Sequence, residues 1–333
     1  MEADLVKRLG VPYAAIPAAG VHGVGIRALP GNVIRLLRGA MASRRILGEF
    51  NPDVLVFTGG YVAVPMAVAG RRTPSLLYVP DVEPGLALKT LARFASTIAL
   101  TAEDSRAFFS ATAQAARLKV TGYPTRSELG SWTRAGGLAH LGLQPERKVL
   151  LVSGGSKGAR SINRSVLANL TRLLQQVQVV HLTGQLDWPE VEAAARSLPS
   201  ELAPAYHAMP YLHEMGAALA AADLVISRAG ASTLGEYPQF ALPAILVPYP
   251  YAWRYQKVNA NYLTRQNAAV IIEDSALPEQ FLPTVLDLLA DETRLDGMRR
   301  AMAALARPQA ANDLACLVEE LAGIPSHPED AHA

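Results

Sequence analysis

Cysteine is almost absent from the 333 residues, with Cys316 as its one occurrence. A disulfide framework and a metal site built from several cysteines are therefore excluded, and a reducing compartment fits this composition. An excess of one charge is also lacking, because 31 Lys and Arg stand against 29 Asp and Glu. This near balance gives no overall electrostatic case for a nucleic-acid-binding protein.

Long apolar runs are missing as well. No stretch reaches the roughly 18 uninterrupted apolar residues of a membrane helix. The opening MEADLVKRLG has an early acidic residue and no apolar core, so it does not resemble a signal peptide. We therefore expect a cytoplasmic protein. The polar end IPSHPEDAHA, with its two prolines, predicts a frayed tail over residues 326–333.

Short apolar runs alternate with helical patterns along the chain. Continuous apolar strands between helices predict an α/β fold in which parallel sheets are covered on both faces. A weaker strand candidate lies at residues 11–17. The stronger candidates are residues 53–57, 75–79, 97–100, 118–122, 148–154, 177–184, 223–230, 243–249 and 268–272.

A break between Tyr123 and Glu146 separates two halves of this pattern. The segment is rich in glycine and contains no strong strand, and a new strand–glycine–helix unit follows it. We place a domain boundary near Arg126. Two doubly wound domains would bind ligands at the carboxyl ends of their strands.

Three glycines mark the change from strand to helix in LLVSGGSKGARSIN, residues 150–163. The start of the following helix would present N–H groups that suit a pyrophosphate. Ser156 would add a hydroxyl, and Lys157 or Arg160 a positive charge. The pattern is neither G-x-G-x-x-G nor a P-loop, so a tight turn without a ligand is an equal alternative.

A second strand, glycine turn and helix follows in VISRAGASTLGEYPQFALPAILVPYP, residues 225–250. Glu236 falls in the first turns of that helix, where a carboxylate would accept the two vicinal hydroxyls of a ribose. Alternatively, Glu236 complements the helix dipole and Ser232 or Thr233 caps the helix. Two such loops in one domain favour a ligand site.

Six segments, in order, resemble motifs of the MurG family, whose members transfer N-acetylglucosamine from its UDP sugar to undecaprenyl-pyrophosphoryl-N-acetylmuramyl-pentapeptide. The resemblance extends from residue 1 to about residue 322. GGSKGARSIN is similar to G-G-S-Q-G-A-R-x-x-N, and RYQKVNA to a motif ending in Q-x-x-N-A. The segments are MEADLV (1–6), PDVLVFTGGYVAVP (52–65), GYPTR (122–126), GGSKGARSIN (154–163), SRAGASTLGE (227–236) and RYQKVNA (254–260).

The resemblance implies the GT-B architecture, an α/β fold of two doubly wound parallel-sheet domains. Residues 1–125 with a returning helix at 308–325 would form the acceptor- and membrane-facing domain, and 126–307 the UDP-sugar donor-binding domain. The family's opening loop, G-G-T-G-G-H, is absent, so we expect the N-terminal domain to lack its first strand–loop–helix unit. A start codon chosen too late would explain this, as would a shortened protein.

The resemblance also implies a donor site. It places Gly155, Ser156 and Gly158 at the pyrophosphate, the backbone of Leu212 against uracil, and Glu236 on the ribose. The remaining implied contacts are Ala231, Ser232 and Thr233 close to the phosphates, Gln256 and Asn259 at the sugar, and Arg126 near the phosphates at the hinge.

On the acceptor side the resemblance implies Gly60, Tyr61 and Asp81. The missing opening loop carries the histidine often proposed as the base of the family, so no such base can be named here. Asp81 stands where an acceptor-site asparagine is expected; it would be a general base or, as we interpret it, a helix cap. Tyr255 replaces a common Gln or His, which leaves the sugar specificity open.

No metal or cofactor is expected beside the donor substrate UDP-GlcNAc. The chain has no D-x-D motif, and Asp81-Val82-Glu83 is a poor metal signal. Aimed backbone N–H groups and an arginine can hold the charge that grows on the leaving UDP without a metal. This agrees with a metal-independent GT-B enzyme.

The segment NVIRLLRGAMASRRILGEF, residues 32–50, is amphipathic. Apolar residues with a basic border suit an anionic membrane surface, on which the family docks. The alternative is an ordinary surface helix packed on the sheet. Val33, Leu36, Leu37, Ala40, Met41 and Leu47 can share one face, and Arg35, Arg38, Arg44 and Arg45 flank it.

The resulting expectation is an inverting transferase that converts lipid I to lipid II on the inner face of the cell membrane. Its partners would be UDP-GlcNAc, the lipid-linked acceptor and anionic lipid, and not nucleic acid. One alternative is a glycosyltransferase with another acceptor, which Asp81 and Tyr255 permit. A second is a nucleotide-sugar binding protein without transfer activity.

Overall fold

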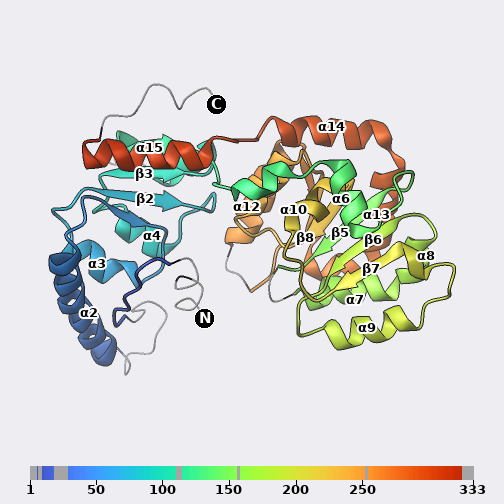
Figure 1. Ribbon diagram of the computed structural model, residues 1–333, viewed down its shortest axis with the longest axis horizontal. Coiled ribbons are helices and arrows are strands. Elements are labelled where there is room, and N and C mark those ends of the chain that lie inside the picture. The colour runs from blue at the N-terminus through green and yellow to red at the C-terminus, as the bar shows by residue number, and fades with distance from the viewer. Residues whose placement is uncertain are drawn as a thin grey trace. The chain divides into compact units, whose positions relative to one another are not determined.

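The structure is a computed structural model that describes residues 6, 10–18, 29–109, 115–155, 158–251 and 254–324 (Figure 1). The chain divides into two compact units. The first unit comprises Met1–Pro80, Pro84–Val120 and Asn312–Ala333, and the second comprises Asp81–Glu83 and Thr121–Ala311. The domain boundaries expected from the sequence, at residues 126 and 308, remain predictions.

The described strands of the first unit form a parallel sheet in the order β1-β2-β3-β4. Its middle strands are continuous apolar runs; β2, for example, is buried along its whole length, as expected for a sheet with both faces covered. The strands are β1 (Leu55–Phe57), β2 (Ser75–Val79), β3 (Thr97–Leu100) and β4 (Leu118–Val120). The helices are α2 (Leu29–Phe50), α3 (Ala63–Ala69), α4 (Leu86–Leu91), the 3₁₀ helix η2 (Glu103–Phe108) and α15 (Ala310–Ala322).

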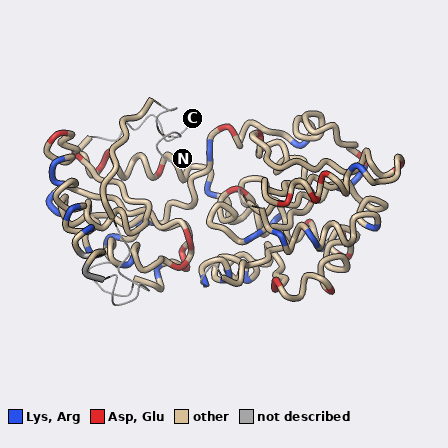
Figure 2. The backbone as a smooth tube through the Cα atoms, turned by 90° about the horizontal axis from the view of Figure 1, so that it is seen from below, with Lys and Arg blue, Asp and Glu red and all other residues tan. Residues whose placement is uncertain are grey.

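The long helix α2 packs against α3 through its small residues. A Cβ on Gly39 would lie 3.2 Å from the Cγ of Pro65 in α3, and Ser43 is fully buried. The opposite side of α2 faces solvent, and basic segments follow one another along this helix in Figure 2. Leu37 and Met41 are exposed there, whereas Leu36 and Leu47, expected on the same face, are half-buried.

The second unit has a six-stranded parallel sheet in the order β10-β9-β8-β5-β6-β7. The strands run outward in both directions from the neighbouring pair β5 and β8, so the sheet reverses its winding there. The loops after β5 and β8 diverge at such a reversal and leave a crevice at the carboxyl ends of the strands. The strands are β5 (Val149–Ser153), β6 (Gln178–Leu182), β7 (Tyr206–Met209), β8 (Leu224–Ser227), β9 (Ala244–Leu246) and β10 (Ala269–Ile271).

Helices cover this sheet on both faces (Figure 1). They are α6 (Arg134–Leu141), α7 (Arg160–Ala168), α8 (Leu170–Leu174), α9 (Trp188–Arg196), α10 (Met215–Ala221), α11 (Thr233–Gln239), α12 (Tyr255–Arg265), α13 (Leu277–Ala290) and α14 (Glu292–Ala303). Short 3₁₀ helices occur at η3 (Ser127–Ser131), η4 (Ala203–Ala205) and η5 (Asp274–Ala276).

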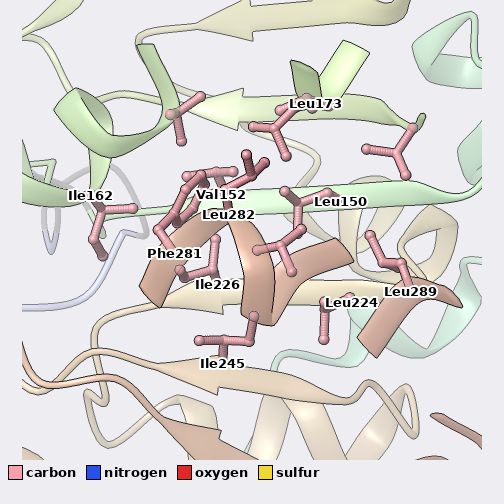
Figure 3. Packing of buried hydrophobic residues seen from close by; sticks show 14 of the residues in the cluster. Leu150, Val152, Ile162, Leu173, Leu224, Ile226, Ile245, Phe281, Leu282 and Leu289 are labelled. Carbon is pink, nitrogen blue, oxygen red and sulfur yellow. The ribbon is translucent and has the colours of Figure 1, made fainter. Parts of the chain in front are cut away.

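A hydrophobic core of the second unit lies between the sheet and helices that include α7, α8 and α13 (Figure 3). Leu150 and Val152 of β5 and Ile226 of β8 meet the fully buried ring of Phe281 in one cluster. Each such side chain contributes roughly 1.5–3 kcal/mol by leaving water. This packing fixes β5 and β8, and with them the start of each loop that forms the crevice.

All nine strong strand candidates contain a strand, which confirms the α/β fold. The weak candidate at 11–17 is wrong, because that segment has no regular structure. The edge strand β7 was not expected. Only Tyr206 of its four residues is buried, so the strand lacks the apolar run that marks the others.

The packing of α6 on α10 predicts a sharp response at one glycine. A Cβ on Gly137 would lie 2.3 Å from the carbonyl oxygen of Ala217, so the helix backbones touch there. We expect Gly137→Ala to lower the free energy of unfolding by about 1–3 kcal/mol, as overpacking does. Urea denaturation measures it.

The matched control is Gly297→Ala in α14, where no atom lies within 4 Å of the added Cβ. Because alanine has a higher helix propensity than glycine, the free energy of unfolding of this variant should rise by up to about 1 kcal/mol. Equal effects at both glycines would contradict the close approach of α6 and α10.

Candidate active site

A cleft of about 1290 Å³ opens in the second unit at the carboxyl ends of its strands. The loops after β5 and β8, which diverge at the reversal of the sheet, both line it. Of the residues that the sequence predicts for the donor site, it brings together Arg126, Gly155, Gly158, Leu212, Ser232, Thr233, Glu236 and Gln256.

The other predicted site residues lie elsewhere. Ala231 and Asn259 do not line the cleft, and Ser156 lies outside the described residues. Gly60 and Tyr61 belong to the first unit, in the exposed turn between β1 and α3.

The loop after β5 depends on its glycines for two different reasons. Gly155 and Gly158 have φ of +76° and +77°, which residues with a side chain rarely adopt. Gly158 also approaches the end of β6 so closely that a Cβ would lie 2.2 Å from the carbonyl oxygen of Thr183. The glycines are therefore needed for the turn itself, and the loop is pressed against the neighbouring strand.

The helix α7 begins directly after this turn, with Ala159 at its N-cap. No side chain of the described residues caps it, so among those residues the first N–H groups of the helix lack the usual intrahelical or side-chain acceptors. Arg160, Ser161 and Arg164 of its first turns line the cleft. A helix start of this kind, with cations beside it, suits an anionic group.

A buried polar network underlies the start of α7. Arg160 donates from Nε to Oδ1 of Asp187 at 2.9 Å, and Asn163 donates from Nδ2 to Oδ2 of the same carboxylate at 2.9 Å. His181 lies between Asn163 and Tyr206, with its Nε2 3.0 Å from the Asn163 Oδ1 and its Nδ1 2.8 Å from the Tyr206 hydroxyl. Burial lowers the pKa of His181 to about 3.

Glu236 lies at the opposite loop, in the first turns of α11. Its partial burial raises the pKa of the carboxyl, while the positive charge of Arg126 and a hydrogen bond from Ser232 lower it. Ser232 is the N-cap residue of α11 but its side chain does not cap the helix. The Thr233 hydroxyl donates to the carbonyl oxygen of Gly230 at 2.7 Å, so both hydroxyls at this helix start bond to nearby residues.

The cleft also contains a hydrogen-bonded cluster around Arg228, which was not predicted from the sequence. Arg228 donates to Asp274 Oδ1 at 2.5 Å, to the Ser161 hydroxyl at 2.8 Å and to the carbonyl oxygen of Val247 at 3.1 Å. Its guanidinium also lies 5.2 Å from the ring centre of Tyr249. Arg228 does stand at the end of a predicted strand, but no local pattern indicates Asp274 as its partner.

Gln256 and Asn259, one turn apart on α12, have different surroundings. Gln256 lines the cleft and accepts at Oε1 from the backbone N–H of Tyr249 at 2.8 Å. Asn259 is fully buried, and its Nδ2 donates to Ala229 O at 3.2 Å and to Asp81 Oδ1 at 2.7 Å. Its Oδ1 accepts from the backbone N–H of Val82 at 3.0 Å.

Asp81 is not a helix cap, which corrects the interpretation from sequence. The next helix, α4, has Gly85 as its N-cap, and Asp81 lies four residues earlier in a bend. Burial raises the pKa of Asp81, and the hydrogen bond from Asn259 lowers it. Nearby, the buried Glu83 accepts from Arg254 at 2.6 and 2.5 Å.

Comparison with known proteins identifies the family. Residues 1–100 match the N-terminal domain of glycosyltransferase family 28, and residues 149–314 match its C-terminal domain. A UDP-N-acetylglucosamine–N-acetylmuramyl-(pentapeptide) pyrophosphoryl-undecaprenol N-acetylglucosamine transferase of Roseiflexus sp. (strain RS-1) is 39% identical over 96% of this chain and 81% of its own. The transferase of that name from Desulforudis audaxviator (strain MP104C) is 38% identical, over 97% of this chain and 88% of its own. This chain belongs to the MurG family of glycosyltransferases.

The fold agrees with that membership. The crystal structure of MurG from Acinetobacter baumannii has a TM-score of 0.74 to this chain at 24% sequence identity, covering 96% of this chain and 88% of that one. The two parallel-sheet units are thus those of a GT-B glycosyltransferase, as the motifs predict.

Two features are absent from the described residues. No helix there combines the length and apolarity needed to cross a membrane. Nor do three or more His, Cys, Asp or Glu side chains of that part of the chain gather where they could hold a metal ion.

The burial of His181 predicts how stability depends on pH. The fold lowers its pKa from the ordinary 6.5 to about 3, so the folded protein resists a proton that the unfolded chain binds. The stabilisation is present above pH 6.5 and is lost as the pH falls toward 3. Between pH 7 and pH 5 the free energy of unfolding therefore falls by about 2 kcal/mol on account of His181.

Urea denaturation of wild type and His181→Gln at pH 7 and pH 5 measures this loss. Between pH 7 and pH 5 the free energy of unfolding of the variant should fall by about 2 kcal/mol less than that of the wild type. His207→Gln, at a partly exposed histidine of β7, is the matched control and should keep most of the wild-type slope. Identical pH slopes for wild type and His181→Gln would contradict a neutral buried His181.

Proposed function

We propose that this chain transfers N-acetylglucosamine from UDP-GlcNAc to the C4 hydroxyl of undecaprenyl-pyrophosphoryl-MurNAc-pentapeptide. The reaction converts lipid I to lipid II in peptidoglycan synthesis. The observation that carries the proposal is the cleft that joins both glycine loops at the reversal of the sheet, in a chain whose curated relatives carry this activity in their names. It acts at the cytoplasmic face of the cell membrane.

The donor binds across this cleft. The start of α7, with Gly155 and Gly158, holds the pyrophosphate, because its N–H groups have no acceptor within the helix. Glu236 accepts the ribose hydroxyls from the opposite loop, and the backbone of Leu212 faces the uracil. Ser232, Thr233 and Arg126, which line the cleft, lie near the phosphates, and Gln256 lies near the sugar.

The reaction inverts the anomeric carbon. The acceptor hydroxyl attacks from the face opposite UDP, and the bond to the diphosphate breaks as its negative charge grows. N–H groups and cations already aimed at that charge lower the barrier without rearranging. This chemistry requires no metal.

Asp81 is our candidate for the general base. Burial raises its pKa, while the hydrogen bond from Asn259 lowers it, and a raised pKa is the direction that favours a carboxylate as a base. Asn259 holds one of its oxygens. Gly60 and Tyr61 are our candidates for acceptor contacts in the first unit. Asn259 is fully buried, so we do not propose it as a contact to the sugar. We propose instead that it positions the Asp81 carboxylate.

Loss of the Glu236 carboxylate should weaken donor binding. Hydrogen bonds to a charged group contribute roughly 1.5–3 kcal/mol, so Glu236→Ala should bind UDP-GlcNAc about 10- to 100-fold more weakly, and Glu236→Gln less so. Calorimetry measures the affinity. Transfer of labelled N-acetylglucosamine to lipid I, compared with other glycan and lipid acceptors, measures the reaction.

The control is Glu190→Ala, which removes an exposed carboxylate of α9 that does not line the cleft. Binding without transfer to any acceptor would favour a nucleotide-sugar binding protein, and transfer to another acceptor would change the substrate. A folded wild-type chain that does not bind UDP-GlcNAc would exclude the proposal.

The exposed side of α2 is our candidate for docking on anionic lipid. Leu37 and Met41 are each 61% exposed on α2, and Arg38 and Arg44 are exposed beside them. Exposed apolar side chains with basic neighbours enter the headgroup region of a bilayer, where each cation adds about 1 kcal/mol near anionic lipid. The surface would bring the enzyme to its lipid-linked acceptor.

Sedimentation with phosphatidylglycerol vesicles tests this surface. Leu37→Ser with Met41→Ser, and separately Arg38→Gln with Arg44→Gln, should each weaken binding about tenfold or more at low salt. Leu186→Ser, at an exposed leucine of the second unit, should bind as the wild type does. Equal binding of the wild type to phosphatidylcholine vesicles, or no effect of either pair, would reject α2 as the docking surface.

A further inference from the structure

Five polar side chains form a continuous hydrogen-bonded chain from the core of the second unit to the donor cleft. It runs from Tyr206 through His181, Asn163 and Asp187 to Arg160. The first four residues are buried, whereas the Arg160 side chain is 62% exposed and lines the cleft. Buried polar groups are costly unless each finds a partner, so the chain needs a complete set of donors and acceptors.

The hydrogen bonds of Asn163 fix the direction of the whole chain. Its Nδ2 donates both hydrogens, one to the Thr183 carbonyl and one to Asp187, each at 2.9 Å. Its Oδ1 must then accept, so His181 carries its proton on Nε2. The free Nδ1 of His181 accepts the Tyr206 O–H. Because burial holds the pKa of His181 at about 3, this one-proton form persists at neutral pH.

Asp187 gives its carboxylate to this chain and not to its own helix. It is the N-cap residue of α9, a place where aspartate commonly accepts from the first N–H groups of the helix. Here its side chain makes no such bond. Oδ2 accepts from Asn163 and Oδ1 accepts from Nε of Arg160.

The result is a guanidinium held at one edge. Arg160 is bound through Nε, and within the described residues its two terminal amino groups have no hydrogen-bond partner. A planar guanidinium with two free amino groups matches two oxygens of a phosphate. Since the position of Asp187 is set by Asn163 and His181, little conformational freedom of Arg160 remains to be lost when an anion binds.

We propose that Arg160 binds the nonbridging oxygens of the donor diphosphate, with Asp187, Asn163 and His181 as the positioning residues that aim its guanidinium. The assignment rests on the proposed function, because it takes the UDP sugar as the ligand of this cleft. As the bond to the sugar breaks, charge moves onto these oxygens and the contact strengthens. Arg160 thus contributes to kcat as well as to donor binding.

A series of uridine, UMP and UDP, measured by calorimetry, tests the contact in the full chain. Arg160→Gln should bind UDP about 10- to 100-fold more weakly, as loss of a charged hydrogen-bonding pair predicts, and uridine as the wild type does. The UDP affinity of Arg160→Lys should lie between those of the wild type and Arg160→Gln, since lysine keeps the positive charge but lacks the planar guanidinium. Arg172→Gln removes an exposed arginine of α8 outside the cleft and should change neither affinity.

The positioning residues are tested through Arg160. Asp187→Asn should also weaken the binding of UDP and leave the binding of uridine unchanged, but its effect should be smaller than that of Arg160→Gln. The double variant Arg160→Gln, Asp187→Asn should be no weaker than Arg160→Gln alone, because both changes remove one contact. His181→Gln, which keeps a donor near the Nε2 position, should retain more UDP affinity than His181→Leu. Additive losses, or equal losses of uridine and UDP affinity, would mean that these residues only support the fold.

The outcomes separate this assignment from the proposed function. If the folded wild-type chain binds neither UDP nor UDP-GlcNAc, both are wrong. If it binds UDP and Arg160→Gln binds UDP equally well, the assignment of Arg160 is wrong and the donor site stands. Because the Arg160 side chain is largely exposed, its variants are expected to fold and give a readable result.

Discussion

The backbone of Gly158 lies against the carbonyl oxygen of Thr183, and the geometry of the cleft depends on this approach. With no side chain between them, the loop after β5 is pressed onto the end of β6. Asn163, one turn into α7, donates to that same carbonyl oxygen, so the turn and the helix are fixed to one atom. The uncapped start of α7 is thereby held at the cleft in a single orientation, as a site for an anion requires.

Two ion pairs of the second unit share one arrangement. Arg160 pairs with Asp187 and Arg254 with Glu83; in both pairs the carboxylate is buried and the arginine is largely exposed. The pair of Arg228 and Asp274 differs, because the arginine, 12% exposed, is more buried than the carboxylate, which is 25% exposed. A carboxylate held by the core restricts the long arginine side chain before any ligand arrives. This removes part of the entropy cost of binding, and the exposed amino groups keep their hydration until then.

The sequence predicts what depends on local pattern. The apolar runs locate nine strands, and the glycines at 154–158 locate the turn, because φ and close backbone approach limit that place to glycine. Partners distant in sequence are not predictable in this way. Arg228 meets Asp274 only because β8 and β10 end at the same edge of the sheet. His181 is hidden for a similar reason, since its role comes from a neighbour on α7 and another on β7.

Asn259 shows how a motif residue and a ligand contact can differ. The motif places it with Gln256 at the sugar, and both do lie on one side of α12. Yet Asn259 is fully buried, and its amide group already joins Ala229, Asp81 and Val82. Ala229 immediately precedes Gly230, which lines the cleft in the loop after β8. Asn259 therefore holds the backbone of that loop, while the same amide group binds the Asp81 carboxylate. One buried side chain thus joins the loop after β8 to the candidate base Asp81, a connection that the spacing Q-x-x-N-A does not reveal.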